Sequence, residues 1–313
     1  MDPNFSFQKS ESSESEDNGH PVYFRSQITD YSETLELASG SKTTVIFGQP
    51  VENRSVYIME RRPGCDLGVA IVNEKIRHSR YAVVDNLDSQ NFISFLGYYE
   101  SHPLKITSKE VPDFYKEQIF KEICKIMTNL QQNLSEVQFI DIAGSIDFLM
   151  NSVRDHITLA KPINSCVIKL SPFVHQSYLE GIEVPVFHIG LDRKFDIDYL
   201  TRGQKLQETS RFCYYDLEEG AERHIAAMTE AFNKFDTIEL VIDCQVFSTE
   251  YFQGISVPFP FSFTKQEIFK IFKLITANKN KVKFVGICHF NPAVEERRSS
   301  SFLADFLYKF IAS

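Results

Sequence analysis

The sequence predicts an α/β protein built around a central, mainly parallel sheet of eight strands. After residue 40, short runs rich in β-branched and aromatic residues alternate with longer segments that carry apolar residues at three- and four-residue spacing, the pattern of βα units. The 313-residue chain is 43% apolar and contains 28 Phe and 13 Tyr, which is enough material for a large core. No internal repeat or long linker divides this part, so we expect one domain rather than two.

Eight short segments have the composition of strands. Each is rich in β-branched, aliphatic or aromatic residues, and several are apolar along most of their length, as expected for strands buried on both faces of a parallel sheet. In chain order the predicted strands are Thr43–Phe47, Tyr81–Val84, Gln138–Ile142, Cys166–Leu170, Val184–Ile189, Phe212–Tyr215, Thr237–Ile242 and Lys281–Ile287.

Five longer segments have the spacing of amphipathic helices. Their apolar residues recur every three or four positions, so one side of each helix can cover the sheet. The predicted helices are Asp113–Leu130, Ile146–Ala160, Glu218–Phe235, Thr264–Asn278 and Ser301–Ile311.

The first forty residues differ from the rest of the chain. Ser10–Asp17 is a run of serines and acids, and Ser39–Lys42 is a second polar stretch. This composition predicts a disordered Ser/Glu-rich tail over residues 1–40, followed by one domain over residues 41–313. Serines flanked by acids suit acid-directed kinases, but a solubilising tail without regulation is the simpler interpretation.

Charge and cysteine content exclude several classes of protein. The 42 acidic and 33 basic residues give a net charge of −9, which disfavours binding to nucleic acid. No stretch approaches the roughly 20 apolar residues of a membrane span, and the polar N-terminus is unlike a signal peptide. The six cysteines form no CxxC pair, which argues against a zinc finger or a secreted disulfide scaffold. We therefore expect a cytoplasmic protein with reduced thiols, without nucleic-acid or membrane partners.

Several segments carry motifs in a characteristic order. Leu240–Pro258 (LVIDCQVFSTEYFQGISVP) and Lys283–Glu296 (KFVGICHFNPAVEE) each join a predicted strand to the loop after it. Upstream, Val45–Pro50 (VIFGQP) is followed by the loop Arg62–Gly68 (RPGCDLG). From about residue 43 to residue 311, this order resembles that of the ureohydrolases, the arginase, agmatinase and formimidoylglutamase family.

The resemblance implies a three-layer α/β/α arginase-like domain, commonly assembled as a trimer or hexamer. Active members of the family hold two Mn²⁺ ions through carboxylates and imidazoles, and the metals activate a water that attacks a guanidinium or formimino carbon. Several places on the chain correspond to the positions that supply these ligands.

Most of the corresponding residues cannot bind manganese. After the predicted strand Gln138–Ile142, Ile146 stands where the family has histidine. After the strand Cys166–Leu170, Ser171, Phe173 and His175 stand where the family has an aspartate, a histidine and an aspartate. After the strand Thr237–Ile242, Asp243 is kept but Gln245 replaces the second aspartate. The resemblance therefore implies vestigial metal-site positions that have lost the binuclear cluster.

The substrate side is altered as well. His289 stands where the family has a glutamate that pairs with the guanidinium-like group, and histidine cannot supply a bidentate carboxylate. Only residues 176–183 separate His175 from the next predicted strand, where active relatives carry a longer loop that holds the substrate. We therefore regard His289 as a vestigial substrate position.

These observations favour a catalytically inactive, arginase-like pseudoenzyme without manganese or another cofactor. Its role would be regulatory or binding, as a homotrimer, with a regulatory protein partner such as an active homologue, or through a small molecule in the old cavity. The alternative is a hydrolase of non-peptide C–N bonds with a remodelled mononuclear site, in which His175, Asp243 and His289 hold Zn²⁺ or Fe²⁺. Against any ligand role, the simpler interpretation of Asp243 is a structural carboxylate that binds backbone amides.

Overall fold

Nine strands form one sheet in the computed structural model, which describes residues 28–29, 42–49, 68, 71–72, 75, 91–98, 113–134, 136–173, 181–192, 212–259 and 262–312. The strand order is β1-β3-β2-β4-β9-β8-β5-β6-β7, and neighbouring strands are parallel throughout. The strands are β1 (Ile28–Thr29), β2 (Lys42–Gln49), β3 (Asn91–Tyr98), β4 (Glu136–Ala143), β5 (Ser165–Leu170), β6 (Val186–Leu191), β7 (Phe212–Asp216), β8 (Thr237–Asp243) and β9 (Val282–Cys288).

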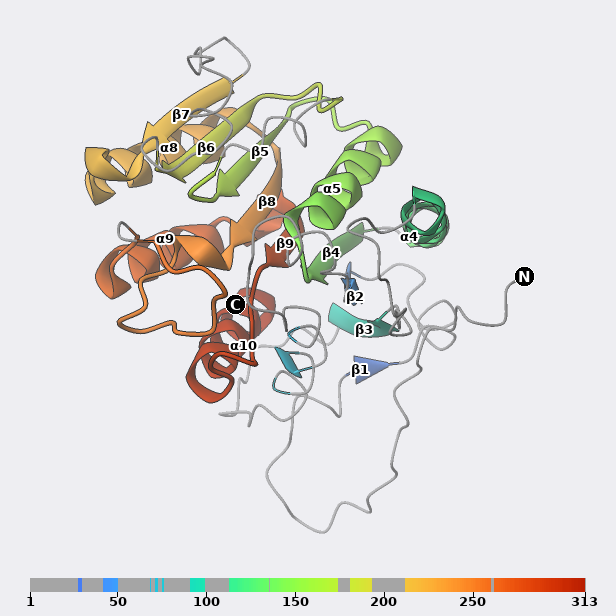
Figure 1. Cartoon of the computed structure of the whole chain (residues 1–313). Helices are drawn as coiled ribbons and strands as arrows, with labels where there is room; N and C mark the ends of the chain where they lie inside the picture. Colours follow the sequence, from blue (N-terminus) through green and yellow to red (C-terminus); the bar gives the residue numbers. More distant parts are fainter. Residues whose placement is uncertain are drawn as a thin grey trace, which may run out of the picture.

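Helices cover both faces of the sheet and complete a three-layer α/β/α domain (Figure 1). On one face lie α4 (Asp113–Asn133) and α5 (Ile146–Ala160). On the other face lie α8 (Ala221–Lys234), α9 (Lys265–Ala277) and α10 (Arg297–Ala312). The described residues also form the short 3₁₀ turns η2 (Leu217–Glu219), η3 (Cys244–Val246) and η4 (Lys279–Lys281).

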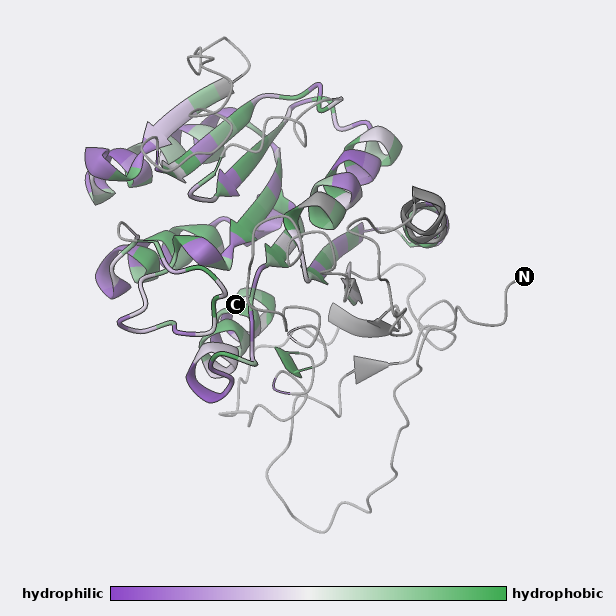
Figure 2. Ribbon diagram, viewed as in Figure 1, coloured by the Kyte–Doolittle hydropathy of each residue, from purple (hydrophilic) through white to green (hydrophobic). Residues whose placement is uncertain are grey.

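Strand alternation divides the core into two apolar clusters. Val45 and Val167 belong to the cluster under α4 and α5, whereas their neighbours Ile46 and Ile168 belong to the cluster under α8, α9 and α10. Successive strand residues point to opposite faces, so a strand covered on both sides must be apolar at nearly every position. Figure 2 agrees, because the central strands are largely green and helices such as α8 and α10 are purple on their outer sides.

The predicted fold class is confirmed. Of the eight predicted strands, seven correspond to β2 and β4–β9, and the eighth, Tyr81–Val84, lies outside the described residues. The sheet gains β1 and β3, which the sequence did not reveal, so the described residues contain nine strands rather than eight. β6 begins at Val186 rather than Val184 because Pro185 has no N–H to donate to a strand partner.

Helix boundaries follow local capping. α5 has the predicted bounds, whereas α9 starts at Lys265 because a reciprocal pair of hydrogen bonds between Thr264 and Glu267 closes its first turn. α10 starts at Arg297, four residues before the predicted start, because the Glu295 carboxylate accepts hydrogen bonds from the backbone N–H groups of Arg298 and Ser299. Partial burial raises the pKa of Glu295, but these hydrogen bonds lower it overall.

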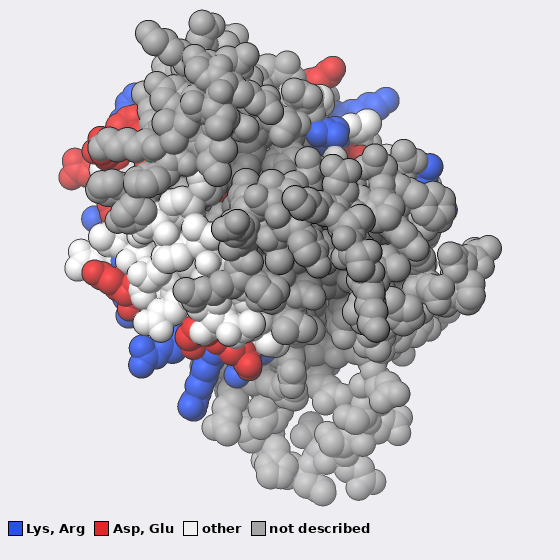
Figure 3. Space-filling view, viewed as in Figure 1, with Lys and Arg blue, Asp and Glu red and all other residues white. Residues whose placement is uncertain are grey.

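The two-residue strand β1 pairs with β3 and lies within residues 1–40, whose other members are outside the described residues. The division into a tail and a domain therefore stays a prediction. Within the described part of the chain, no helix combines the length and apolarity needed to cross a membrane. On the face shown in Figure 3, described basic and acidic side chains are intermixed, without a large basic patch.

Candidate functional site

The candidate site lies where three adjacent parallel strands end. β5, β8 and β9 are neighbours, and the carboxyl ends of parallel strands meet at one edge of the sheet, where ligands bind in open α/β folds. Ser171 follows β5, Asp243 ends β8, and Cys288 ends β9 with His289 directly after it. Asp243 and Cys288 are register partners, so strand pairing itself brings their side chains to the same face.

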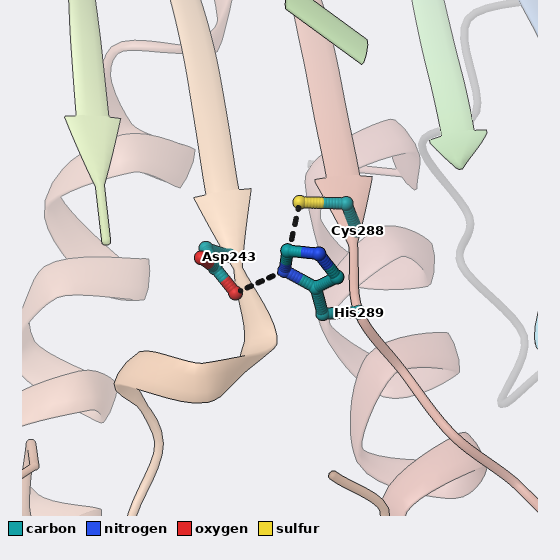
Figure 4. Close-up of side chains that lie close together, drawn as sticks. All are labelled: Asp243, Cys288 and His289. Carbon is teal, nitrogen blue, oxygen red and sulfur yellow. Dashed lines mark hydrogen bonds and ion pairs between the residues drawn. The ribbon is translucent and has the colours of Figure 1, made fainter. Parts of the chain in front are cut away.

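Asp243 is the centre of a buried polar network (Figure 4). Its Oδ1 lies 2.9 Å from His289 Nδ1 and accepts a hydrogen bond from Gln245 N at 3.0 Å. Its Oδ2 accepts a hydrogen bond from Ser171 Oγ at 3.0 Å. The side chains of Asp243 and His289 are 0% and 1% exposed, so this pair is shielded from water and held by its neighbours.

Cys288 brings a third potential ligand to the pair. Its Sγ lies 3.9 Å from His289 Nδ1, and the donor atoms of Asp243, Cys288 and His289 all lie within 4.8 Å of one another. The contacts of the imidazole with Cys288 and Asp243 both use the same nitrogen, Nδ1. A Cys-His-Asp relay needs one nitrogen for the thiol and the other for the carboxylate, so this geometry does not form a nucleophilic triad.

The backbone of His289 explains how consecutive residues reach one carboxylate. In a continuing strand, residues 288 and 289 would point to opposite faces of the sheet. His289 instead has φ 61°, in the left-handed region, which costs a non-glycine residue about 1–3 kcal/mol. The chain turns out of β9 at this point, and the imidazole meets Asp243 beside the thiol of Cys288 (Figure 4).

Two buried basic side chains support the turn after β5. Lys169 Nζ donates a hydrogen bond to the carbonyl oxygen of Phe173 at 2.8 Å, and His188 Nε2 donates one to the carbonyl oxygen of Ser171 at 2.8 Å. Burial lowers the pKa of His188 well below its ordinary value, and the nearby charge of Lys169 lowers it further. His188 is therefore neutral at pH 7, with its proton on Nε2.

The structure brings together three of the residues predicted for the site: Ser171, Asp243 and His289. Gln245 binds Asp243 through its backbone N–H, and its buried side-chain amide has no hydrogen-bond partner among the described residues. Ile146 begins α5 in the same apolar cluster as Cys288.

Phe173, another predicted position, does not join this network through its side chain. The Phe173 ring packs edge-on against Phe259 at a centroid distance of 4.7 Å. His175 lies outside the described residues.

Sequence reasoning missed Cys288, Lys169 and His188. Lys169 and His188 carried a signal, since each is a polar residue within a strand that is otherwise almost wholly apolar, and such residues are usually held by specific partners. Cys288 carried none, because a thiol at the end of an apolar strand looks like any small core residue.

Comparisons with solved structures agree with this architecture. The formimidoylglutamase of Bacillus subtilis matches with a TM-score of 0.73 and 14% identity, over 97% of this chain and 95% of that one. The Trypanosoma cruzi formiminoglutamase with Mn²⁺ matches with a TM-score of 0.69 and 16% identity, over 94% and 98%. An arginase superfamily protein from Trypanosoma cruzi matches with a TM-score of 0.64 and 16% identity, over 93% and 97%. The chain has an arginase-like fold.

The resemblance seen in the motifs is thus confirmed for the fold. No protein-family model matches the sequence, and no curated protein matches it either. One fold can support many chemistries, so the function of this arginase-like chain must be argued from its own site.

Among the described positions that the motif resemblance aligns with metal ligands, two have side chains without a donor atom. Mn²⁺ is bound best by several carboxylates and imidazoles, but Ile146 and Phe173 have no donor atom in their side chains and the Ser171 hydroxyl is already bonded to Asp243. The expectation that no metal binds at all is not supported either, because Asp243, Cys288 and His289 form a group that could hold one ion.

Proposed function

We propose that this arginase-like protein hydrolyses a non-peptide C–N bond at a remodelled site that holds one metal ion through Asp243 and His289. The convergence of the donor atoms of Asp243, Cys288 and His289 within 4.8 Å supports this proposal most directly. This cluster of donor atoms lies at the edge of the sheet where open α/β folds bind their ligands. The fold itself is shared with formimidoylglutamase.

A bound metal ion would polarise the substrate and make water a stronger nucleophile near neutral pH. The chain's own residues orient that chemistry. Ser171 and the N–H of Gln245 fix the Asp243 carboxylate from two sides, and His289 Nδ1 must be unprotonated to act as a ligand. In the net reaction the oxygen of water stays on the attacked carbon and the leaving nitrogen gains a proton. Since His289 cannot make a bidentate pair with a guanidinium group, we do not expect arginine or agmatine as substrates.

A second candidate is the inactive pseudoenzyme with a regulatory or binding role. It is supported by the bonds that Asp243 already makes to Ser171, Gln245 and His289, which would satisfy a purely structural carboxylate. A homo-oligomer, most simply a trimer, and a cytoplasmic location remain predictions; light scattering of the purified chain tests the first.

Metal content and turnover separate the two candidates. The purified chain is stripped with chelator, reloaded with Zn²⁺, Fe²⁺ or Mn²⁺, and assayed for release of ammonia, urea or formamide from a panel of amides, amidines and guanidines. The hydrolase proposal expects turnover with one bound metal per chain, lost in Asp243→Asn while the circular dichroism spectrum is unchanged. A well-folded chain without turnover under every metal supports the pseudoenzyme instead.

A further inference from the structure

We propose that Cys288 is the third protein ligand of this site, and that the site is built for Zn²⁺ rather than Mn²⁺. This inference rests on the proposed function for its role in catalysis, but metal binding can be measured independently of turnover. Its basis is the cluster of one carboxylate, one thiol and one imidazole at the ends of β8 and β9 (Figure 4).

Two of the three separations between the donor atoms are close to those around one tetrahedral ion, and the third, from Cys288 Sγ to the Asp243 carboxylate, lies within 4.8 Å. With Zn–S bonds of about 2.3 Å and Zn–N or Zn–O bonds of about 2.0 Å, tetrahedral geometry separates the sulfur from the nitrogen by about 3.5 Å and the nitrogen from the oxygen by about 3.3 Å. The corresponding separations are 3.9 Å for Cys288 Sγ to His289 Nδ1 and 2.9 Å for His289 Nδ1 to Asp243 Oδ1. Each needs to change by only about half an ångström, which small side-chain rotations supply.

The donor set selects the metal. A thiolate is a soft ligand that favours zinc, whereas Mn²⁺ favours carboxylate and other oxygen donors. Three protein ligands leave the fourth tetrahedral position open, which is the arrangement of catalytic rather than structural zinc sites. Cys288 therefore distinguishes this cluster from the oxygen-rich site that manganese requires.

Gln245 gives a second, independent indication of a missing ligand. Its side chain is 0% exposed, and neither its Oε1 nor its Nε2 has a hydrogen-bond partner among the described residues. It lies two residues beyond Asp243 and binds that carboxylate through its own N–H. A buried amide left unpaired costs about 1–3 kcal/mol, so a bound water or substrate is the expected partner.

The test is a zinc and cobalt titration of the full chain after treatment with chelator and reductant. We expect one tightly bound Zn²⁺ per chain, in preference to Mn²⁺, and a sulfur-to-cobalt charge-transfer band when Co²⁺ replaces zinc. Cys288→Ser should abolish that band and weaken zinc binding by more than about 100-fold, because loss of an outer-shell partner alone already costs 10–100-fold. The matched control is Cys124→Ser, which makes the same chemical change at a half-buried thiol of α4 and should bind as the wild type does.

The cobalt band of the wild type reports sulfur ligation even if Cys288→Ser fails to fold. A folded wild type that binds no zinc, or binds cobalt without a sulfur band, overturns the inference. Zinc bound through Cys288 without turnover on any substrate would leave the inference standing and refute the proposed hydrolase. Turnover with Mn²⁺ that is unchanged in Cys288→Ser would refute this inference and leave the proposed hydrolase standing.

Discussion

Lowering the pH should destabilise this protein through His188, the buried imidazole beneath the site. Burial and the neighbouring charge of Lys169 place the pKa of His188 well below its ordinary value of 6.5 in the folded chain. The unfolded chain, with an ordinary histidine, therefore binds a proton below pH 6.5 that the folded chain does not bind. The stability that the neutral form contributes is complete above pH 6.5 and is lost progressively as the pH falls toward the folded pKa.

The loss of stability on acidification follows from the pKa of His188 in the unfolded chain, because the folded chain keeps this histidine neutral. At about pH 5.5, one unit below 6.5, protonation of an unfolded histidine stabilises the unfolded state by about 1.4 kcal/mol. His224, whose pKa is lowered mainly by burial, acts in the same direction, so the wild-type loss is not that of His188 alone. The contribution of His188 is the difference between the wild type and His188→Gln, in which a neutral amide can still donate to the Ser171 carbonyl.

The assay is urea denaturation at about pH 7.5 and about pH 5.5, with chelator present so that metal binding does not contribute. Between the two conditions the wild type should lose about 1.4 kcal/mol more than His188→Gln. For a domain of this size, that difference corresponds to roughly 3–6 °C in melting temperature. Equal losses in the two proteins would show that His188 is not held neutral in the folded state, and the described environment of the β5 turn would be wrong.

Two further predictions concern the packing that positions the site. Glu239→Leu removes the buried carboxylate that lies 3.0 Å from His156 Nδ1, and it should lower the free energy of unfolding by about 3–5 kcal/mol. Glu239→Leu combined with His156→Leu should cost much less, and a double-mutant cycle without coupling would contradict this. Gly286→Ala should cost about 1–3 kcal/mol because the added methyl group meets the Leu149 side chain of α5, and Leu149→Ala in the same chain should relieve part of that cost; thermal unfolding of both variants measures it, and an unchanged melting temperature for Gly286→Ala would refute the close contact.

The strong elements of the fold were readable because their patterns are local. The apolar spacing of Ile146–Ala160 gave the bounds of α5, since helix periodicity extends over four turns there. β1 could not be found, because two residues carry no pattern, and Asn91–Tyr98 interrupts its apolar residues with Ser and Gly. Both strands depend on pairing with β2 or β3 rather than on their own composition.

The site was only partly readable. Motif order predicts that Ser171, Asp243 and His289 lie near one another, and Asp243 contacts both of the other side chains in the structure. Cys288 looks like any small core residue at the end of an apolar strand, so the sequence does not single it out. Strand alternation alone would place residues 288 and 289 on opposite faces of the sheet. The left-handed backbone at His289 breaks that alternation, and such a conformation at a non-glycine residue has no sequence signal.

By itself, the sequence determined the α/β class and most of the alternating order of strands and helices, because periodicity and burial act between residues close in the chain. It also determined that Ile146 and Phe173, which the motif resemblance aligns with metal ligands, carry no side-chain donor atom in any conformation. Only the tertiary structure decided which potential metal-ligand atoms lie close together. The parallel register of β8 and β9 sets Asp243 beside Cys288, and the turn at His289 adds the imidazole, so residues about 45 positions apart form one cluster.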